Sequence, residues 1–209
     1  MAHGDVRGFL SRGWAYERLQ TAVGSNRSHA RFLAEYVEPR DGERLLDLGC
    51  GPAHILGALP AGVAYVGVDP SDAYIGRAKR RWGDRGEFRV GDGREPLGSK
   101  ASFDVVLAMG VLHHLDDAGC AALVGNAARS LAPGGRFVTI DPSRAEGQPR
   151  TAAWLIGKDR GSFVRTAQAY AELARGAFGS VRAGVRSDLL RVPYTHAVLV
   201  CTDARREHR

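Results

Sequence analysis

The chain has 209 residues, of which 44% are hydrophobic and 25% are charged, so we expect a single globular domain rather than a disordered chain. It has no apolar run of the ~18 residues that a membrane span needs, its start lacks a signal-peptide core, and its three cysteines lack metal-ligand spacing. We therefore expect a cytoplasmic protein. Four of the six net positive charges fall in residues 141–192, which does not suit the uniform basic face of a nucleic-acid binder.

The first 43 residues are expected to form a helical cap or lid on the main domain, residues 44–209. Apolar side chains recur in this segment at the spacing of a helix face. It contains Trp14 and Tyr16, which are candidates to cover a bound cofactor and substrate, although aromatic residues at this spacing are commonly packed in a core.

From residue 44 onward, short apolar runs alternate with helix-like stretches. The runs that predict strands are 44–48, 64–68, 87–90, 103–109 and 135–140, and the stretches that predict helices are 52–59, 71–81, 116–131 and 166–175. This alternation indicates an α/β fold with a doubly wound parallel sheet and helices on both faces. Residues 181–185 and 197–201 follow without a helix between them, so we expect an antiparallel hairpin at the sheet edge.

A glycine turn follows the first of these strands. Gly49 and Gly51 allow positive φ and a close backbone approach, and Pro52 suits the start of a helix. Asp69 ends the next strand, 20 residues after Gly49, a position from which a carboxylate can accept hydrogen bonds from both ribose hydroxyls. The pattern predicts a site for an adenosine-type cofactor, the alternative being a tight turn without a ligand.

The residues of the turn bear on which cofactor binds. A dinucleotide fingerprint requires G-x-G-x-x-G, because the pyrophosphate sits on the helix N-terminus. Here His54 fills the third glycine position and Pro52 removes a backbone donor. Both features favour a cofactor without phosphates, and a NAD-dependent oxidoreductase remains the outside alternative.

These motifs resemble those of the class I S-adenosylmethionine-dependent methyltransferases, in particular the small stand-alone enzymes. The resemblance implies a Rossmann-like, seven-stranded sheet with the last strand antiparallel. It implies that the turn holds the methionine end of the cofactor, that Asp69 holds the ribose, and that Asp92 meets the adenine edge. The cofactor-binding residues implied in this way are Asp47, Gly49, Cys50, Gly51, Ala53, Asp69, Pro70, Asp92, Gly93 and Met109.

Two adjacent histidines, His113 and His114, follow the predicted fourth strand, at the edge where the methyl group would lie. A hydroxyl nucleophile must lose its proton, and histidine has an ordinary pKa of about 6.5 that suits this task. We expect His113 to be the base and His114 to be the more architectural of the two candidates. By analogy, Gly110 and His113 stand where some metal-assisted relatives carry carboxylates, so no catalytic metal is expected.

The segment after strand five, residues 141–192, is expected to build the acceptor pocket. Arg160 and Arg165 lie there near aromatic residues, which suggests a small-molecule acceptor with a phosphate or carboxylate, such as a sugar derivative. Solvated arginines on a helix face are the alternative.

The function favoured is O-methylation of a small-molecule hydroxyl, with S-adenosylhomocysteine as product. N- or C-methylation, a protein or RNA acceptor, and a cofactor-binding partner subunit without turnover are the alternatives. The run Ala108-Met109-Gly110-Val111 replaces the Asn/Asp-Pro-Pro-aromatic motif of base-amine methylation, so a nucleic-acid acceptor is disfavoured. The oligomeric state is not predicted.

Overall fold

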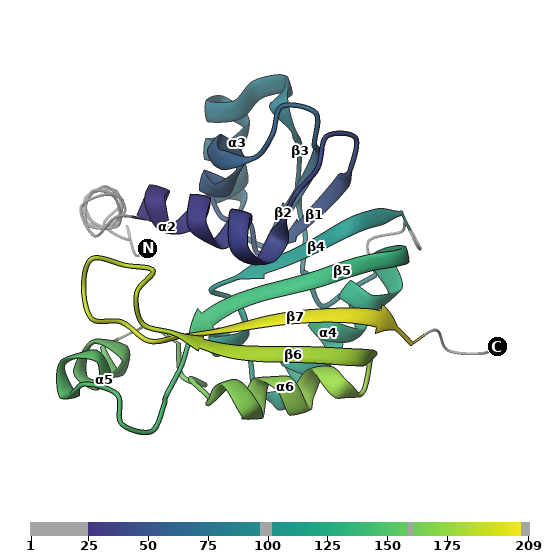
Figure 1. Ribbon diagram of the computed structural model, residues 1–209. Helices are drawn as coiled ribbons and strands as arrows, with labels where there is room; N and C mark the ends of the chain where they lie inside the picture. Colours follow the sequence, from purple (N-terminus) through teal and green to yellow (C-terminus); the bar gives the residue numbers. More distant parts are fainter. Residues whose placement is uncertain (1–24, 97–101, 159–160, 206–209) are drawn as a thin grey trace, which may run out of the picture.

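The computed structural model describes residues 25–96, 102–158 and 161–205. Within these ranges, one seven-stranded sheet has the order β3-β2-β1-β4-β5-β7-β6 (Figure 1). The strands are β1 (Arg44–Leu48), β2 (Ala64–Asp69), β3 (Glu87–Val90), β4 (Phe103–Met109), β5 (Leu131–Pro142), β6 (Phe178–Arg186) and β7 (His196–Ala204). β7 is antiparallel to both of its neighbours, β5 and β6, which confirms the predicted hairpin and the reversed last strand.

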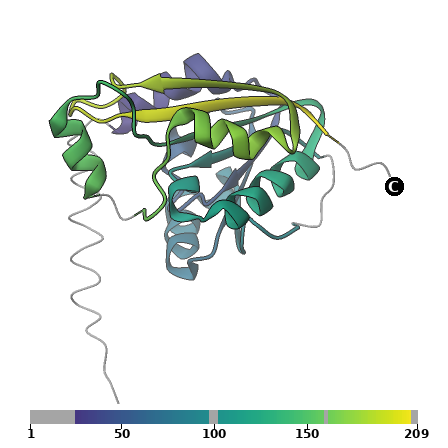
Figure 2. The same ribbon diagram turned by 90° about the horizontal axis from the view of Figure 1, so that it is seen from below.

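Helices cover both faces of the sheet (Figure 2). One face packs against α2 (Ser25–Phe32), its π-helical continuation η1 (Leu33–Val37), η2 (His54–Ala58) and α3 (Asp72–Trp82), and the other packs against α4 (Asp117–Ser130) and α6 (Ala167–Arg175). The central strand β1 is buried on both sides: it reads Arg-Leu-Leu-Asp-Leu, and only its first residue is exposed. This burial is expected of a parallel sheet between two helical layers.

Side-chain caps set where three of the helices begin. The side chains of Ser71, Asp116 and Thr166 each accept a hydrogen bond from a backbone N–H in the first turn of α3, α4 and α6. Each cap satisfies a donor that the helix itself leaves unpaired. These caps explain why the predicted starts at 71, 116 and 166 lie within one residue of the observed ones, and the predicted ends at 81, 131 and 175 also agree within one residue.

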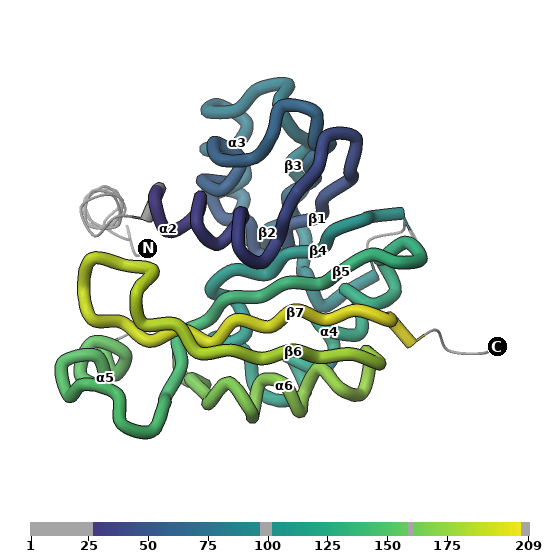
Figure 3. Tube along the Cα trace, viewed as in Figure 1, coloured from purple at the N-terminus to yellow at the C-terminus, as the bar shows by residue number. Residues whose placement is uncertain are grey.

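The helix predicted over 52–59 is instead a short 3-10 turn, η2. Ala53, immediately before it, has a left-handed backbone with φ of 56°, so the chain cannot turn directly from Gly51 into an α-helix. A second difference is α5 (Arg150–Gly157), a helix that the sequence pattern did not predict. The tube in Figure 3 shows α5 and the loop between β6 and β7 at the same end of the sheet.

The described part of the predicted cap packs into the main core. Phe32, Leu33 and Val37 are buried in one cluster with Leu45 and Val105 of the sheet. Arg136 of β5 also donates to the carbonyls of Val37 and Glu38. The described residues 25–43 are therefore continuous with the main core rather than a separate unit, and a lid function stays a prediction. No helix in the described ranges is long and apolar enough to cross a membrane.

Candidate active site

A pocket of about 640 Å³ lies at the carboxyl ends of β1, β2 and β4, where ligands bind in open α/β sheets. Its walls include nine of the ten predicted cofactor residues: Asp47, Gly49, Cys50, Gly51, Asp69, Pro70, Asp92, Gly93 and Met109. Ala53 does not line the pocket; it is buried, and its N–H donates to the Cys50 carbonyl at 2.9 Å. Nine of the ten predicted residues thus line one pocket, and their contact with a cofactor stays a prediction.

The glycine turn is tight because two of its residues have left-handed backbones. Gly49 has φ of 76°, and a Cβ there would meet the Val111 side chain at 2.6 Å. Gly51 has φ of 53°, and a Cβ there would project into open space. Gly49 is thus required by both its backbone and its neighbour, whereas Gly51 leaves the space above the turn clear for a ligand.

Asp69 connects the glycine turn to the start of α3. Its carboxylate accepts from the N–H of Gly51 at 2.9 Å and from the N–H of Ser71 at 2.8 Å. Each carboxylate oxygen has a second lone-pair direction, so Asp69 can hold the turn and still accept hydrogen bonds from a ligand in the pocket.

Asp47 presents a buried carboxylate oxygen that has no partner. Its Oδ2 accepts from the Tyr65 hydroxyl at 2.7 Å, while its Oδ1 has no hydrogen-bond partner among the residues that the structure describes. Burial raises the pKa of Asp47 to about 7. An unsatisfied buried acceptor at a pocket wall is costly to leave, so this oxygen suits a ligand donor, above all a cationic one.

Arg94 is a pocket residue that the motifs did not indicate. Its Nε contacts both oxygens of Asp92 at 2.9 Å, and the guanidinium lowers the pKa of that carboxyl. The ion pair fixes the Asp92 side chain at the pocket wall. The signal for it was the local spacing Asp92-Gly93-Arg94, which has no distinctive meaning without the fold.

The structure gives the two histidines of the turn after β4 different environments. His114 is exposed and lines the pocket, whereas His113 is buried behind it with 4% of its surface exposed. His113 donates through its backbone N–H and through Nδ1 to Asp141 Oδ1, at 3.2 and 2.9 Å. His113 does not line the pocket and its Nδ1 binds Asp141 instead, so the structure does not support the expectation that His113 meets the acceptor.

The two rings are nonetheless in contact, with centroids 4.0 Å apart and planes tilted by 40°. Burial raises the pKa of Asp141, and its second oxygen, Oδ2, has no partner among the described residues. An Asp–His pair behind an exposed histidine fixes the tautomer and orientation of the inner ring. The outer ring, that of His114, is the one of the two that lines the pocket.

The pocket lining also contains two histidines that the sequence motifs did not indicate. His29 and His54 both line the pocket, and burial together with the neighbouring His54 lowers the pKa of His29 to about 4. Arg81 donates to His54 Nδ1 at 3.0 Å. At neutral pH His29 is thus an uncharged polar group at the pocket wall.

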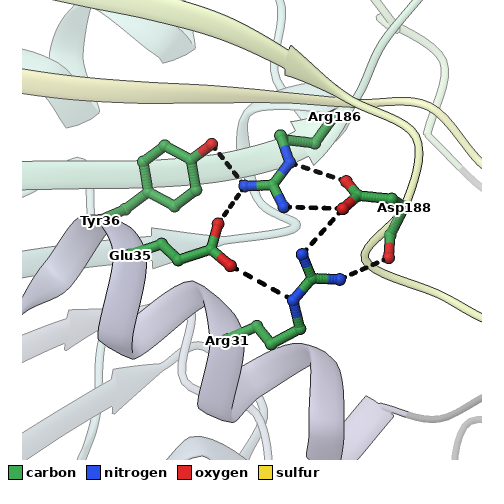
Figure 4. A network of polar contacts seen from close by, with 5 residues as sticks. All are labelled: Arg31, Glu35, Tyr36, Arg186 and Asp188. Carbon is green, nitrogen blue, oxygen red and sulfur yellow. Dashed lines mark hydrogen bonds and ion pairs between the residues drawn. The ribbon is translucent and has the colours of Figure 1, made fainter.

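A polar network fastens α2, which carries His29, to the loop after β6 (Figure 4). Arg186 binds both oxygens of Asp188 at 2.8 and 3.0 Å and the Tyr36 hydroxyl at 2.7 Å, and also contacts Glu35. Arg31 donates to Asp188 Oδ2 and to the Asp188 carbonyl, both at 2.8 Å. The network links two segments that lie 150 to 157 residues apart in the sequence.

The structure does not support the predicted acceptor residue Arg165. Arg165 does not face the pocket, because its guanidinium binds Asp117 and the carbonyls of Leu112, Leu115 and Phe163. It has no donor to spare for an anionic acceptor, so that assignment was wrong. Arg160, Trp14 and Tyr16 lie outside the described residues. Within those residues, no three His, Cys, Asp or Glu side chains are grouped to hold a metal ion.

Residues 45–135 match the family model for a methyltransferase domain. Residues 45–135 therefore form a methyltransferase domain. The chain is 33% identical over 147 residues to the nocamycin O-methyltransferase of Saccharothrix syringae, a match that covers 66% of this chain and 50% of that protein. It is 39% identical over 117 residues to the 27-O-demethylrifamycin SV methyltransferase of Amycolatopsis mediterranei, covering 52% and 42%.

The chain thus spans half or less of the length of these relatives. Among solved structures, it resembles the pyocyanin biosynthetic protein PhzM with a TM-score of 0.72 and 22% identity, covering 95% of this chain and 62% of that one. A TehB-like methyltransferase from Corynebacterium glutamicum has a TM-score of 0.66 at 18% identity, covering 92% and 96%. These likenesses establish the fold.

The residues of the pocket fit S-adenosylmethionine, the cofactor of this family. The unpaired Asp47 oxygen suits an ammonium group, and the open space above Gly51 admits a ligand against the backbone. Asp69 and Asp92 add further hydrogen-bond acceptors to the pocket lining. The site needs no phosphate-binding feature to complete it.

Proposed function

We propose that this methyltransferase methylates a hydroxyl oxygen of a small-molecule acceptor. The observation that carries the proposal is His114, which lines the cofactor pocket and contacts a buried His113–Asp141 pair. The names of the relatives support it, since the matches include the nocamycin and ubiquinone O-methyltransferases.

When bound, S-adenosylmethionine supplies an activated methyl group for in-line transfer. The glycine turn and Asp69 would hold the cofactor in place, and Asp47 would accept hydrogen bonds from its amino group. Holding the two reactants in near-attack geometry can contribute roughly 7–11 kcal/mol. The remaining requirement for a hydroxyl acceptor is the removal of its proton.

His114 is the group placed to take that proton. It is exposed to the pocket, and its ring packs on the ring of His113, which Asp141 fixes through Nδ1. Asp141 and His113 therefore act as positioning residues, while His114 would touch the acceptor. General-base catalysis of this kind contributes typically ~10²–10⁴-fold.

The structure gives little support to an acceptor that carries a phosphate or carboxylate. Its main described cation, Arg165, is fully engaged by Asp117 and three carbonyls. The residues that line the pocket next to His114 in the sequence include Met109, Val111 and Leu115. An acceptor with an apolar body and one reactive hydroxyl fits this lining better, which agrees with the natural-product names of the relatives.

The test is a screen for S-adenosylhomocysteine released from S-adenosylmethionine, using phenols, sugars and macrolactone alcohols beside the matching amines and a tRNA pool. We expect turnover with a hydroxyl compound, and we expect His114→Asn to lower kcat by roughly 100-fold. The affinity of the variant for S-adenosylhomocysteine, measured by calorimetry, should stay unchanged. Turnover with only amines or tRNA, or full activity in His114→Asn, would overturn the proposal.

A further inference from the structure

The turn that carries His113 and His114 is held from outside by a short segment, residues 161–165, which we name the strap. The Phe163 N–H donates to the His113 carbonyl at 3.0 Å. The far end of the strap is fixed to the sheet, because Arg165 forms a bridge with Ser143 at the end of β5, and the Arg144 N–H donates to the Arg165 carbonyl at 3.1 Å. The strap therefore joins the histidine turn to the strand that supplies Asp141.

Gly161 lies directly against the buried histidine. A Cβ built on Gly161 would stand 1.9 Å from Cδ2 of the His113 ring and 2.7 Å from the His113 carbonyl oxygen. Real Cβ atoms do not approach so closely, so any other residue here must push the ring or the strap aside. The requirement for glycine comes from this contact with His113 rather than from an unusual backbone angle.

Arg165 fixes the other side of the turn. Its five N–H groups all have acceptors: Asp117 Oδ1, which accepts twice, and the carbonyls of Leu112, Phe163 and Leu115. Leu112 and Leu115 immediately flank the two histidines, and only 12% of the Arg165 side chain is exposed. A lysine has three donors on a single nitrogen and cannot span these acceptors.

His113 is thus held between the strap and the sheet. Gly161 covers one part of the ring, Asp141 binds its Nδ1 at 2.9 Å, and His114 packs on it with centroids 4.0 Å apart. A displacement of His113 must therefore be passed to His114, the ring that lines the pocket. Misplacement of a catalytic group by 1 Å can cost about 100-fold in rate.

We propose that the strap is a positioning element for catalysis, in which Gly161 and Arg165 set the orientation of His114 by locking His113 against Asp141. This inference rests on the proposed role of His114 at the methyl-transfer site. Neither Gly161 nor Arg165 lines the pocket, so both act through the histidine turn and not by touching a ligand.

The test compares Gly161→Ala with Gly157→Ala. Gly157 ends α5 four residues earlier, and a Cβ there would meet nothing within 4 Å, so it is the matched control. The first readout is the NMR spectrum of the imidazoles in protein labelled with ¹⁵N-histidine. We expect Gly161→Ala to shift the His113 and His114 signals and to weaken the solvent protection of the His113 Nδ1 proton, while Gly157→Ala superimposes on the unmodified protein.

The second readout is catalysis and cofactor binding with the acceptor found in the screen. Gly161→Ala should lower kcat at least tenfold, with the Kd for S-adenosylhomocysteine changed less than twofold. Arg165→Lys should do the same and also serves if Gly161→Ala does not fold. Should the unmodified enzyme methylate no hydroxyl, the proposed function fails, yet the NMR comparison still decides the strap. Unchanged histidine signals in both Gly161→Ala and Arg165→Lys would overturn the inference.

Discussion

At the scale of single residues, we predict that Asp47 makes cofactor binding depend on pH. Its carboxyl is buried and holds a proton up to about pH 7, yet it accepts hydrogen bonds from a cationic amino group best when it is ionised. Binding below pH 7 must therefore release a proton, so affinity falls as the pH falls. We expect the Kd for S-adenosylhomocysteine to be roughly tenfold higher at pH 6 than at pH 8.

Calorimetry in two buffers of different ionisation enthalpy measures both this Kd and the proton released. The Asp47→Asn variant keeps an oxygen for the Tyr65 hydroxyl but cannot ionise, so it should bind weakly and without this pH dependence. A Kd that is the same at pH 6 and pH 8 in the unmodified protein would contradict the role of Asp47.

The same carboxyl affects folding in the opposite direction. Its folded-state pKa of about 7 lies above the ordinary value of 3.8, so between these limits the folded state binds more protons than the unfolded state. The contribution of Asp47 to the free energy of unfolding is therefore present at low pH and is lost as the pH rises toward 7. At neutral pH the buried Asp47 carboxyl therefore lowers the free energy of unfolding, while it supplies an acceptor at the pocket wall.

At the scale of elements, the ionic network around Arg186 fixes α2 beside the pocket. Arg186 is the last residue of β6, and 17% of its side chain is exposed. It contacts Glu35 and Tyr36 of η1, which continues α2. We expect Arg186→Met to loosen residues 28–37, because their links to the loop after β6 are lost. Hydrogen–deuterium exchange of these amides should become roughly tenfold faster.

Arg182 offers a matched control, since it lies on the same strand and is exposed. Arg182→Met should leave exchange in residues 28–37 unchanged, and neither variant should alter the central strands β1 and β4. Equal exchange rates in Arg186→Met and Arg182→Met would show that the network does not hold α2.

Elements with a strong local signal were predicted well. β1 and β4 are mostly apolar runs, and α3 and α4 begin at the polar caps Ser71 and Asp116. η2 was overestimated because the left-handed conformation of Ala53 is imposed by the turn and not by local propensity. α5 was missed because it lacks a side-chain cap and carries an exposed Trp154 in place of a full apolar face.

At the scale of the whole molecule, the cofactor pocket could be predicted because its residues follow consecutive strands and meet at one sheet edge. Which of the two histidines lines the pocket could not be predicted, because this depends on Asp141. Asp141 lies 28 residues away from His113 in the sequence and comes close to it only through the pairing of β4 with β5. Arg165 looked like a free cation for the same reason, since its partner Asp117 is 48 residues earlier. Long-range contacts of this kind leave no trace in local spacing.

The most direct test of the account is the binding of S-adenosylhomocysteine measured by titration calorimetry. The account predicts a one-to-one isotherm for the unmodified protein and a Kd at least tenfold higher in Asp69→Asn, because Asp69 lines the pocket and holds the glycine turn. Asp72→Asn, an exposed residue outside the pocket walls, should bind like the unmodified protein. Absence of binding, or an unchanged Kd in a folded Asp69→Asn variant, would contradict the central claim.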